Sequence, residues 1–352
     1  MATQNSGSKE QKTWVSPRAK PSYFLGAPDP QEKPRFCRDT FFGLPRLADL
    51  QRDRSDLLDD HLVSIVPVPF DSGSSYGNGS RFGWRGIRDA STRYRTVNQD
   101  VAFGAAEVAQ ARDLCDYIQI AQADPISCTP FNIGLAVDQM KAGFGKILNL
   151  GGRILAVGGD HTIVYPLLAA EYQKFGKVAV IHFDSHYDTF PGYFGQDVTH
   201  GTPFRNAYEE DLIDPSKSVH IGIHGPIGAL TDQTDDQEMG FTTIASREIF
   251  DHNLGAIVQK TRDVVGDMPV HVSVDIDVLD PGVAPKTGTP EPGGLSAKQL
   301  QELILGLSGL NIVGADIVEV SSDSGQEPTA VAGAGVAFNL LTLMSMRICA
   351  QK

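Results

Sequence analysis

Apolar residues along this chain gather in short runs that alternate with longer segments in which they recur at helical spacing. The short runs predict a first strand over residues 61–70 and further strands near Leu155, Val178, Val219, Thr242, Val272 and Ile312. The longer segments predict helices over residues 85–95, 133–150, 162–174, 254–265, 296–307 and 329–348, of which the fifth begins at the capping-type residue Ser296. Strands that alternate with helices in this way predict a parallel sheet with helices on both faces.

The first 60 residues lack this regular pattern. Residues 11–60 are rich in proline, arginine and aspartate, and we expect residues 1–60 to form an N-terminal arm, partly disordered or wrapped around a neighbouring subunit, before a folded domain over residues 61–352. The arm carries too many aromatic residues for a pure linker, so we expect part of it to dock. These aromatic residues are Tyr23, Phe24, Phe36, Phe41 and Phe42.

Composition and charge narrow the class of protein. Hydrophobic residues make up 41% of the 352 residues and charged residues 21%, as in an ordinary globular protein. The net charge of −13 argues against nucleic acid or an anionic membrane as the main partner. We expect neither a secretory signal nor any run that approaches transmembrane length. The four cysteines are scattered without a paired motif, which favours a reduced, cytoplasmic compartment: Cys37, Cys115, Cys128 and Cys349.

Acidic and histidine side chains follow three of the predicted strands. Asp184, His186 and Asp188 stand at alternating positions directly after the apolar run 177–183. Alternating residues of a strand point to the same face, and the carboxyl ends of parallel strands are where ligands bind in open sheets. A second alternating run places Asp275 and Asp277 on one face, and a glycine turn after a third strand leads to His161 at the start of a predicted helix.

Four aspartates and two histidines could therefore meet in one pocket. Two carboxylates about 4 Å apart repel by roughly 4 kcal/mol at an effective dielectric constant near 20, so four together need cations among them. Carboxylate oxygens mixed with imidazoles suit divalent metals such as manganese, and tolerate nickel, cobalt or zinc. Any one of these residues alone could be a turn residue or a satisfied core side chain, but three strand ends of this kind together favour a two-metal site.

Several motifs resemble the ureohydrolase family, which contains the arginases and agmatinases, and the agmatinase- and guanidinobutyrase-like branch in particular. The motifs are Gly158-Gly-Asp-His161, Asp184-Ser-His-Tyr-Asp188, His200-Gly-Thr-Pro-Phe204, Ser273-Val-Asp-Ile-Asp277 and Thr287-Gly-Thr-Pro-Glu-Pro-Gly-Gly294. The resemblance covers residues 61–348, which makes the folded domain a catalytic domain. It implies a three-layer α/β/α fold around a mostly parallel eight-stranded sheet, assembled as a homotrimer or homohexamer, with a hetero-oligomer also possible.

The resemblance also implies roles for individual residues. One metal ion is held by His161, Asp184, Asp188 and Asp275. The other is held by His186, Asp184, Asp275 and Asp277, so that Asp184 and Asp275 bridge the two ions. Manganese is the metal that the family implies first, with nickel as the alternative. Water activated by two such ions near neutral pH is a nucleophile that can attack the carbon of a guanidinium group.

Three catalytic residues follow from the same resemblance. Asp188 is expected to protonate the leaving amine, His200 to shuttle protons, and Glu319 to pair with the guanidinium and orient it. His200 could instead be a loop histidine that only forms hydrogen bonds, and Glu319 could be part of a structural ion pair.

Two further residues are candidates for substrate binding at the mouth of the pocket. Trp84 could stack on a flat cation, although it could equally be buried filler. Ser321 begins the segment 321–325, which departs from the pattern of agmatinase-like members, as do residues 75–79 and 82–84. These departures leave the metal chemistry intact and alter the recognition loops.

The expected activity is hydrolysis of a C–N bond in a small guanidino compound to give urea and an amine. Candidate substrates are 4-guanidinobutyrate, agmatine, guanidine itself and an N-substituted guanidine or biguanide. Arginine is disfavoured because the sequence shows no clear set of residues to bind the α-amino and α-carboxylate groups of an amino acid. A formiminoglutamase-like amidine hydrolase would share every metal residue and release formamide. A non-catalytic subunit of a hetero-oligomer is the third alternative, and the presence of all six ligands argues against it.

Overall fold

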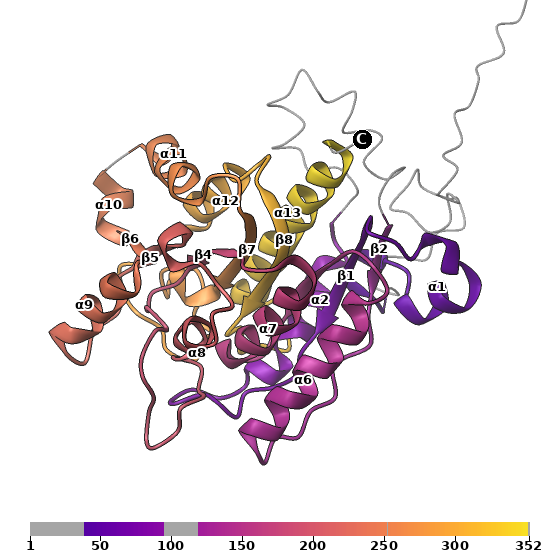
Figure 1. Cartoon of the computed structure of the whole chain (residues 1–352), viewed down its shortest axis with the longest axis horizontal. Helices are drawn as coiled ribbons and strands as arrows, with labels where there is room; N and C mark the ends of the chain where they lie inside the picture. The colour runs from indigo at the N-terminus through magenta and orange to yellow at the C-terminus, as the bar shows by residue number, and fades with distance from the viewer. Residues whose placement is uncertain (1–38, 95–118, 252, 351–352) are drawn as a thin grey trace, which may run out of the picture.

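A single sheet of eight parallel strands runs through the computed structural model, which describes residues 39–94, 119–251 and 253–350 (Figure 1). The strands lie in the order β2-β1-β3-β8-β7-β4-β5-β6, and every neighbouring pair is parallel. Their bounds are β1 Leu62–Pro67, β2 Gln119–Gln122, β3 Arg153–Val157, β4 Ala179–Phe183, β5 Val219–Ile223, β6 Thr242–Ala245, β7 Pro269–Asp275 and β8 Asn311–Val318. This confirms the expected parallel sheet and its number of strands.

Helices cover both faces of the sheet, which confirms the three-layer arrangement (Figure 1). The core on one face is built with α2, α11, α12 and α13, and the core on the other face with α1, α6, α7 and α8. The α-helices in the described residues are α1 Leu47–Asp53, α2 Gly83–Ser91, α6 Ile133–Leu148, α7 Val164–Phe175, α8 Pro203–Glu209, α9 Leu230–Met239, α10 Ser246–Asp251, α11 Leu254–Val265, α12 Ala297–Leu305 and α13 Pro328–Ala350.

Burial on both faces explains why the strands are apolar throughout. On β4, Ile181 and Phe183 belong to the core beneath α11 to α13, whereas Val180 belongs to the core beneath α6 to α8. A strand with both faces covered needs apolar residues at nearly every position. Its sequence is therefore a continuous apolar run and does not alternate between apolar and polar residues. The polar exceptions on such a strand therefore stand out, and His182 is one of them.

Four strands at the centre of the sheet order, β3, β8, β7 and β4, carry the predicted site at their ends. His161 follows β3, Asp184 follows β4 directly, and Asp275 is the last residue of β7. Because all the strands are parallel, these ends lie on one edge of the sheet.

The structure adds elements that the hydrophobic pattern did not predict. Strand β2 is only four residues long and reads Gln-Ile-Ala-Gln, too short and too polar to stand out. Helix α8 has seven residues and starts at Pro203, and α9 has a polar sequence in which only Asp236 is buried. Helices this short or this polar leave no apolar stripe at helical spacing.

Part of the segment before β1 packs on the domain. Phe41 and Phe42 are buried in the core beneath α13, and Leu47, Leu50 and Leu57 are buried in the core on the opposite face. The other aromatic residues of the predicted arm, Tyr23, Phe24 and Phe36, lie outside the described residues.

Helix α13 corrects the expectation that no run approaches transmembrane length. Its window Pro328–Ser345 has 18 residues with a mean hydropathy of 1.3, which by length and composition alone is enough to cross a membrane. In the structure 72% of this window is buried inside the protein, where α13 packs between the sheet, α2 and α12. Its apolar character is therefore that of a core helix.

The expected cap of α12 gives a test of local stability. The Ser296 hydroxyl oxygen accepts a hydrogen bond from the backbone N–H of Gln299 at 3.2 Å, and the Gln299 side chain accepts one from the backbone N–H of Ser296 at 3.0 Å. We expect Ser296→Ala to lower the free energy of unfolding by about 1 kcal/mol, measured by urea denaturation. Ser308→Ala, beyond the end of α12, is the control, and an equal loss in both variants would contradict a capping role.

Candidate metal centre

The six predicted metal ligands converge at the carboxyl edge of the sheet, and all but His186 are almost completely buried. Glycine makes one of the turns that place them. After β3 the chain reverses through Gly158 and Gly159, both at positive φ, and a Cβ on Gly159 would come within 2.6 Å of the Val68 carbonyl oxygen. The turn delivers His161 as the first residue of a short 3-10 helix, His161–Ile163.

His161 stands at the centre of the first group of ligands. Its Nδ1 atom lies 2.8 Å from Asp188 Oδ2, 3.2 Å from Asp184 Oδ2 and 3.4 Å from Asp275 Oδ2. The side chains of His161 and Asp184 are fully buried, and those of Asp188 and Asp275 are less than a tenth exposed. These are the four residues predicted to share one ion.

His186 forms a second group with two of the aspartates. Its Nδ1 atom lies 3.2 Å from Asp277 Oδ2 and 3.4 Å from Asp184 Oδ1. Asp184 thus presents Oδ2 to the first group and Oδ1 to the second, which is the geometry of a bridging carboxylate. The structure brings all six predicted ligands together, and Asp184 stands between the two histidines.

The donor set fits divalent metal ions. Nδ1 of His161 is buried and has no hydrogen-bond partner among the described residues, although it faces three carboxylates. A buried polar atom without a hydrogen bond is costly, and a cation among the carboxylates would satisfy it. Imidazole nitrogen together with carboxylate oxygen is a donor set that such ions accept.

The pKa values of the carboxylates also support a cation site. Burial raises the pKa of Asp275 well above its ordinary value, and the neighbouring Asp277 and Asp184 carboxylates add to this. Burial and the Asp184 carboxylate likewise raise the pKa of Asp188. Burial therefore disfavours the charged form of both acids, and cations beside them would favour the carboxylate form.

Glu319 and His200 lie together beside the first group. Glu319 Oε1 accepts a hydrogen bond from the backbone N–H of His161 at 3.0 Å and lies 3.2 Å from Nδ1 of His200. Its other oxygen, Oε2, is buried and has no partner among the described residues. Nε2 of His200 lies 2.7 Å from the hydroxyl of Ser75. Burial acts to lower the pKa of His200, but the hydrogen bond with Glu319 and the charges of Glu319, Asp188 and Asp160 together outweigh it and raise the pKa to about 9.

Two of the predicted catalytic residues sit in a strained backbone conformation. Asp188 has a φ of 54° and Glu319 a φ of 61°, and neither is a glycine. Positive φ at such residues persists only where the surroundings enforce it, and it is concentrated at functional sites. The strain turns both side chains toward the metal ligands and away from the regular continuation of their strands.

Trp84 and Ser321, the candidates for substrate binding, stand near this edge without contacting the six ligands in any described interaction. Trp84 packs partly against the core, and Arg85 and Arg88 lie over its ring at 5.5 Å and 5.3 Å. Its Nε1 atom is buried without a partner, as is the hydroxyl of Ser321. The stacking role of Trp84 thus stays a prediction, because the ring already carries two guanidinium groups of the chain itself.

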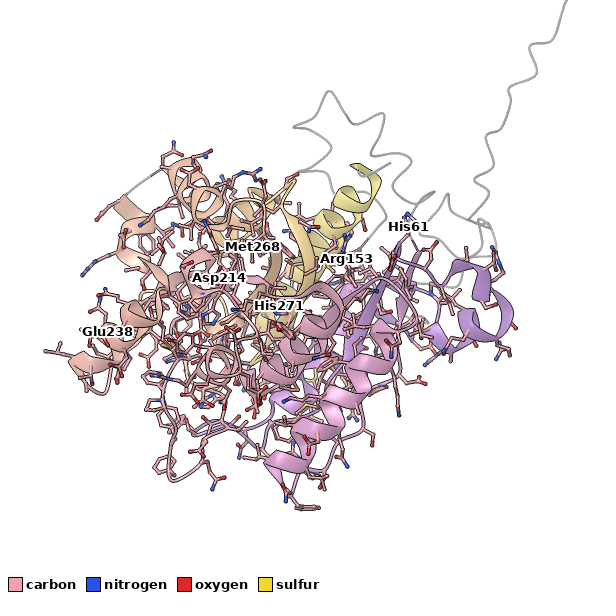
Figure 2. All side chains as sticks on the ribbon, in the orientation of Figure 1. His61, Arg153, Asp214, Glu238, Met268 and His271 are labelled. Carbon is pink, nitrogen blue, oxygen red and sulfur yellow. The ribbon has the colours of Figure 1, made fainter. Side chains whose placement is uncertain are left out.

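A second layer of polar residues beneath the ligands was missed from the sequence. Ser273 Oγ lies 2.9 Å from Nε2 of His161 and donates to Asp316 at 3.0 Å. Behind it, His271, at the centre of the molecule in Figure 2, bridges Asp316 and Glu171 at 2.7 Å and 2.9 Å. Because Asp316 can only accept, Ser273 accepts from His161, which leaves Nδ1 of His161 free to bind a metal ion.

His182 is the most informative of the missed residues. Its Nε2 atom lies 2.8 Å from Asp184 Oδ2, and it belongs to a buried cluster with His161, Asp184 and Asp188. The alternating spacing of Asp184, His186 and Asp188 extends backwards to His182, which was the available signal. It was overlooked because His182 stands inside an apolar strand.

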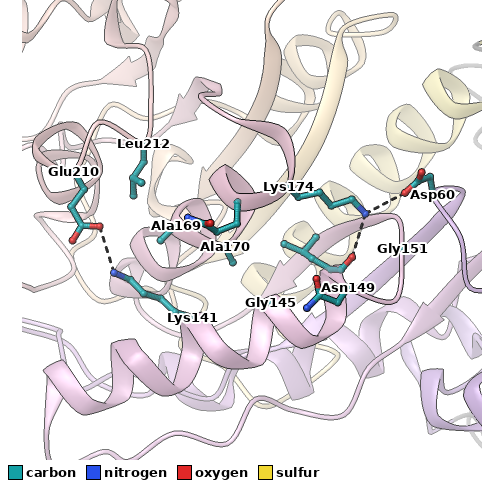
Figure 3. A pocket seen from close by; sticks show the side chains of 12 residues that line it. Asp60, Lys141, Gly145, Asn149, Gly151, Ala169, Ala170, Lys174, Glu210 and Leu212 are labelled. Atoms are coloured by element: carbon teal, nitrogen blue, oxygen red, sulfur yellow. Dashed lines mark hydrogen bonds and ion pairs between the residues drawn. The ribbon is translucent and has the colours of Figure 1, made fainter.

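A surface pocket of about 690 Å³ between α6 and α7 lies outside this site (Figure 3). Its two lysines are already paired, Lys141 with Glu210 at 3.5 Å and Lys174 with Asp60 at 3.3 Å. None of the six metal ligands lines it, so it takes no part in the predicted chemistry.

Comparison with known proteins agrees with this geometry. Residues 61–342 match the family model described as the arginase family. A guanidinopropionase of Pseudomonas aeruginosa is 37% identical over 90% of this chain and 95% of that protein, and a guanidinobutyrase of the same organism is 37% identical over 80% and 86%. The solved structure of proclavaminate amidino hydrolase from Streptomyces clavuligerus is 33% identical, with a TM-score of 0.79 over 90% of this chain and all of that chain.

The shared position of Asp184 makes it the most sensitive ligand. We expect Asp184→Asn to weaken metal binding by more than the roughly 10- to 100-fold that follows from losing an outer hydrogen bond. Elemental analysis after dialysis measures the metal content per chain. Asp263→Asn, on the exposed surface of α11, is the control and should retain the wild-type content. Full occupancy in the Asp184 variant would rule out a bridging role.

Proposed function

Because this chain belongs to the arginase family, we propose that it hydrolyses the C–N bond of a small guanidino compound to urea and an amine. The observation that carries the proposal is the unpartnered Oε2 atom of Glu319, buried beside a ligand set for two metal ions. A buried carboxylate oxygen without a partner is costly, and a guanidinium group supplies N–H donors in the planar arrangement that a carboxylate accepts.

The metal ions would be held by the six residues already described. His161 and Asp188 would hold one ion, His186 and Asp277 the other, and Asp184 and Asp275 would be shared by both. Asp184 faces both histidines, and Asp275 Oδ2 lies 3.4 Å from His161 Nδ1. When bound, two such ions lower the pKa of water and so supply a nucleophile near neutral pH.

Glu319 is proposed to orient the substrate. Its Oε1 atom is fixed by the backbone of His161 and by His200, so the carboxylate has one orientation, with Oε2 left for the substrate. This contact places the planar carbon of a guanidinium group next to the ligands. Orientation of this kind lowers the entropic part of the barrier to attack.

Asp188 and His200 are proposed to manage the protons. Attack by water forms a C–O bond, and cleavage of a C–N bond then gives urea and an amine that must take up a proton. Asp188 is next to His161 and can pass that proton to the leaving nitrogen. The raised pKa of His200 means that its imidazole is protonated near neutral pH. It can therefore donate a proton to the reacting groups, and its Nε2 atom lies beside the hydroxyl of Ser75.

The proposed substrates are small guanidino compounds with a short tail: 4-guanidinobutyrate, agmatine, guanidine, or an N-substituted guanidine or biguanide. The two relatives from Pseudomonas aeruginosa carry the names guanidinopropionase and guanidinobutyrase, which supports the first of these. The loop after β1 approaches the site closely, because a Cβ on Gly77 would lie 2.6 Å from the Gly288 carbonyl oxygen, and Gly288 itself adjoins Glu319. Backbone packed this tightly supports a small substrate.

Manganese is the proposed metal and nickel the alternative, and the chain is proposed to act in the cytoplasm. The donor set of four carboxylates and two imidazoles supports manganese, since hard oxygen ligands dominate. Both metals belong in the assay, because imidazole also suits nickel.

The role of Glu319 can be tested with a variant of the same shape. We expect Glu319→Gln to lower kcat/KM for urea release by roughly 10- to 100-fold, because it replaces a hydrogen bond to a charged group by a neutral one. Metal content should stay at the wild-type level. Glu302→Gln, on the exposed side of α12, is the matched control.

The assay should compare guanidine, 4-guanidinobutyrate, agmatine, arginine and substituted biguanides with manganese- and nickel-loaded protein. Release of formamide from a formimino substrate without urea from any guanidino compound would favour the amidine hydrolase instead. Unchanged turnover in Glu319→Gln would show that this carboxylate does not bind the substrate. Metal-loaded protein that releases neither product would favour the non-catalytic subunit.

The chain is proposed to assemble as a homotrimer or homohexamer. Four large apolar side chains in loops or at helix starts beyond β1, β2, β4 and β5 are more than four-fifths exposed, namely Tyr76, Phe131, Phe194 and Leu230. Burial of such residues against further copies would remove apolar area from water. Sedimentation velocity should show a species of three or six chains, whereas a monomer at micromolar concentration would contradict the proposal.

A further inference from the structure

A row of buried polar residues crosses the sheet two residues before the predicted ligands Asp184 and Asp275. In the register of the strands, His182 on β4 pairs with Ser273 on β7 and with His220 on β5, and His220 pairs in turn with Thr243 on β6. Residues in register on neighbouring parallel strands point to the same face, so this row lies on one face of the sheet. His182, His220 and Ser273 are completely buried.

Helix α9 contributes a charge to the end of this row. Its sequence Leu-Thr-Asp-Gln-Thr-Asp-Asp-Gln-Glu-Met is polar, and its one buried residue is Asp236, which is 0% exposed. Glu238 of the same helix lies at the outer edge of the molecule (Figure 2). An ionisable group is almost never fully buried unless it is paired. Its partners should therefore explain why this helix docks where it does.

Asp236 is held by side chains from three elements of the sheet region. Its Oδ1 atom lies 3.0 Å from Nε2 of His220 and accepts a hydrogen bond from the hydroxyl of Thr189 at 3.1 Å. Its Oδ2 atom accepts a longer one from Thr243 at 3.4 Å. The contact with His220 is short, but it lacks the alignment of a hydrogen bond.

From His220 the contacts continue to a metal ligand. Nδ1 of His220 lies 2.7 Å from Nδ1 of His182, and Nε2 of His182 lies 2.8 Å from Oδ2 of Asp184. A neutral imidazole ring carries one N–H. A carboxylate can only accept, so that N–H is on Nε2 and points at Asp184. Nδ1 of His182 then accepts from His220.

Aromatic rings enclose these contacts. Phe204 lies 4.4 Å from His182 between ring centres, Phe241 lies 4.4 Å from His220, and Tyr187 lies 5.9 Å from His220. Such surroundings exclude water and strengthen the electrostatic contacts that remain.

We propose that Asp236, His220 and His182 form a positioning chain that fixes the orientation of Asp184 and couples helix α9 to metal binding. The inference rests on the proposed two-metal site and adds residues that do not contact the substrate or the ions. Asp184 has to present one oxygen to each group of ligands, so a rotation of its carboxylate would impair both. The N–H of His182 prevents that rotation, and Asp236 holds the ring of His220 that orients His182. Partners behind a metal ligand typically change metal affinity by 10- to 100-fold.

The first experiment measures metal affinity, not activity. Manganese and nickel are titrated into metal-free protein in competition with a chromophoric chelator. We expect Asp236→Asn to raise the dissociation constant by about tenfold. Asp235→Asn is the matched control, because it removes the neighbouring acid of the same helix, whose one described contact is a 3.8 Å ion pair with Arg205. Equal affinities in Asp236→Asn and wild type would overturn the proposal.

A double variant separates a chain of contacts from general loosening of the fold. If Asp236 acts through His220, then Asp236→Asn combined with His220→Gln should lose no more affinity than the more affected single variant. Losses that multiply would mean that the two residues act independently, and the chain would be refuted. Circular dichroism of each metal-free variant restricts the comparison to folded protein.

Reciprocal coupling provides a readout in the wild-type chain. If α9 is coupled to metal binding, metal must stabilise α9 to the same extent. Hydrogen exchange of peptides covering residues 230–239 should therefore slow on addition of manganese, and slow less in Asp236→Asn. Unchanged exchange would refute the coupling. Wild-type protein that binds no divalent metal would overturn the proposed function itself, whereas normal binding without these effects overturns the positioning chain alone.

Discussion

The burial of four carboxylates at one edge of a sheet is the constraint on which the rest of this structure depends. Their mutual repulsion and their loss of hydration must be offset, and the protein does this with histidines and with a donor set made for cations. The strand order also helps to bring the acids together. It sets the ends of β3, β7 and β4 close to one another at the centre of the sheet, so that no long loop is needed to bring the acids together.

The scaffold around the acids is correspondingly rigid. Asp188 and Glu319 adopt positive φ angles that cost free energy and that only dense surroundings can maintain. Beneath them, the chains of contacts through Ser273 and through His182 end on buried carboxylates, Asp316 and Asp236. Each chain gives one ligand a defined hydrogen-bonding role. The geometry of the site is thus determined as much by the layer below the ligands as by the ligands themselves.

The parts of the site that could be predicted from the sequence are those whose residues lie close together in the chain. The alternation of Asp184, His186 and Asp188 is a local pattern that singles out these residues. In the structure His186 lies beside Asp184, while Asp184 and Asp188 both face His161, although β4 has ended before them. The family resemblance supplied the pairing of ligands, and the fold it implied is confirmed. The row formed by His182, Ser273 and His220 depends on the register of strands that are not consecutive in the chain, which no local pattern reveals.

Other features escaped prediction for reasons of composition. Strand β2 is a short polar segment that becomes a strand only because β1 offers it a partner. Helix α9 has no apolar face, so hydrophobic spacing could not identify it, and Asp236 looked like any other acid on a charged surface. In the structure Asp236 is fully buried and contacts His220 and Thr189, which the sequence did not indicate.

The close approach of Gly77 to Gly288 bears on two tasks of the proposed site, metal binding and the choice of substrate. The acids and histidines proposed to hold the ions follow the inner strands, whereas the wall beside Glu319 is formed partly by the loop that follows β1, nearer the rim of the sheet. The reaction and the choice of molecule are therefore built on different parts of the scaffold. A change in that wall would alter which compound fits beside Glu319 without moving the six predicted ligands.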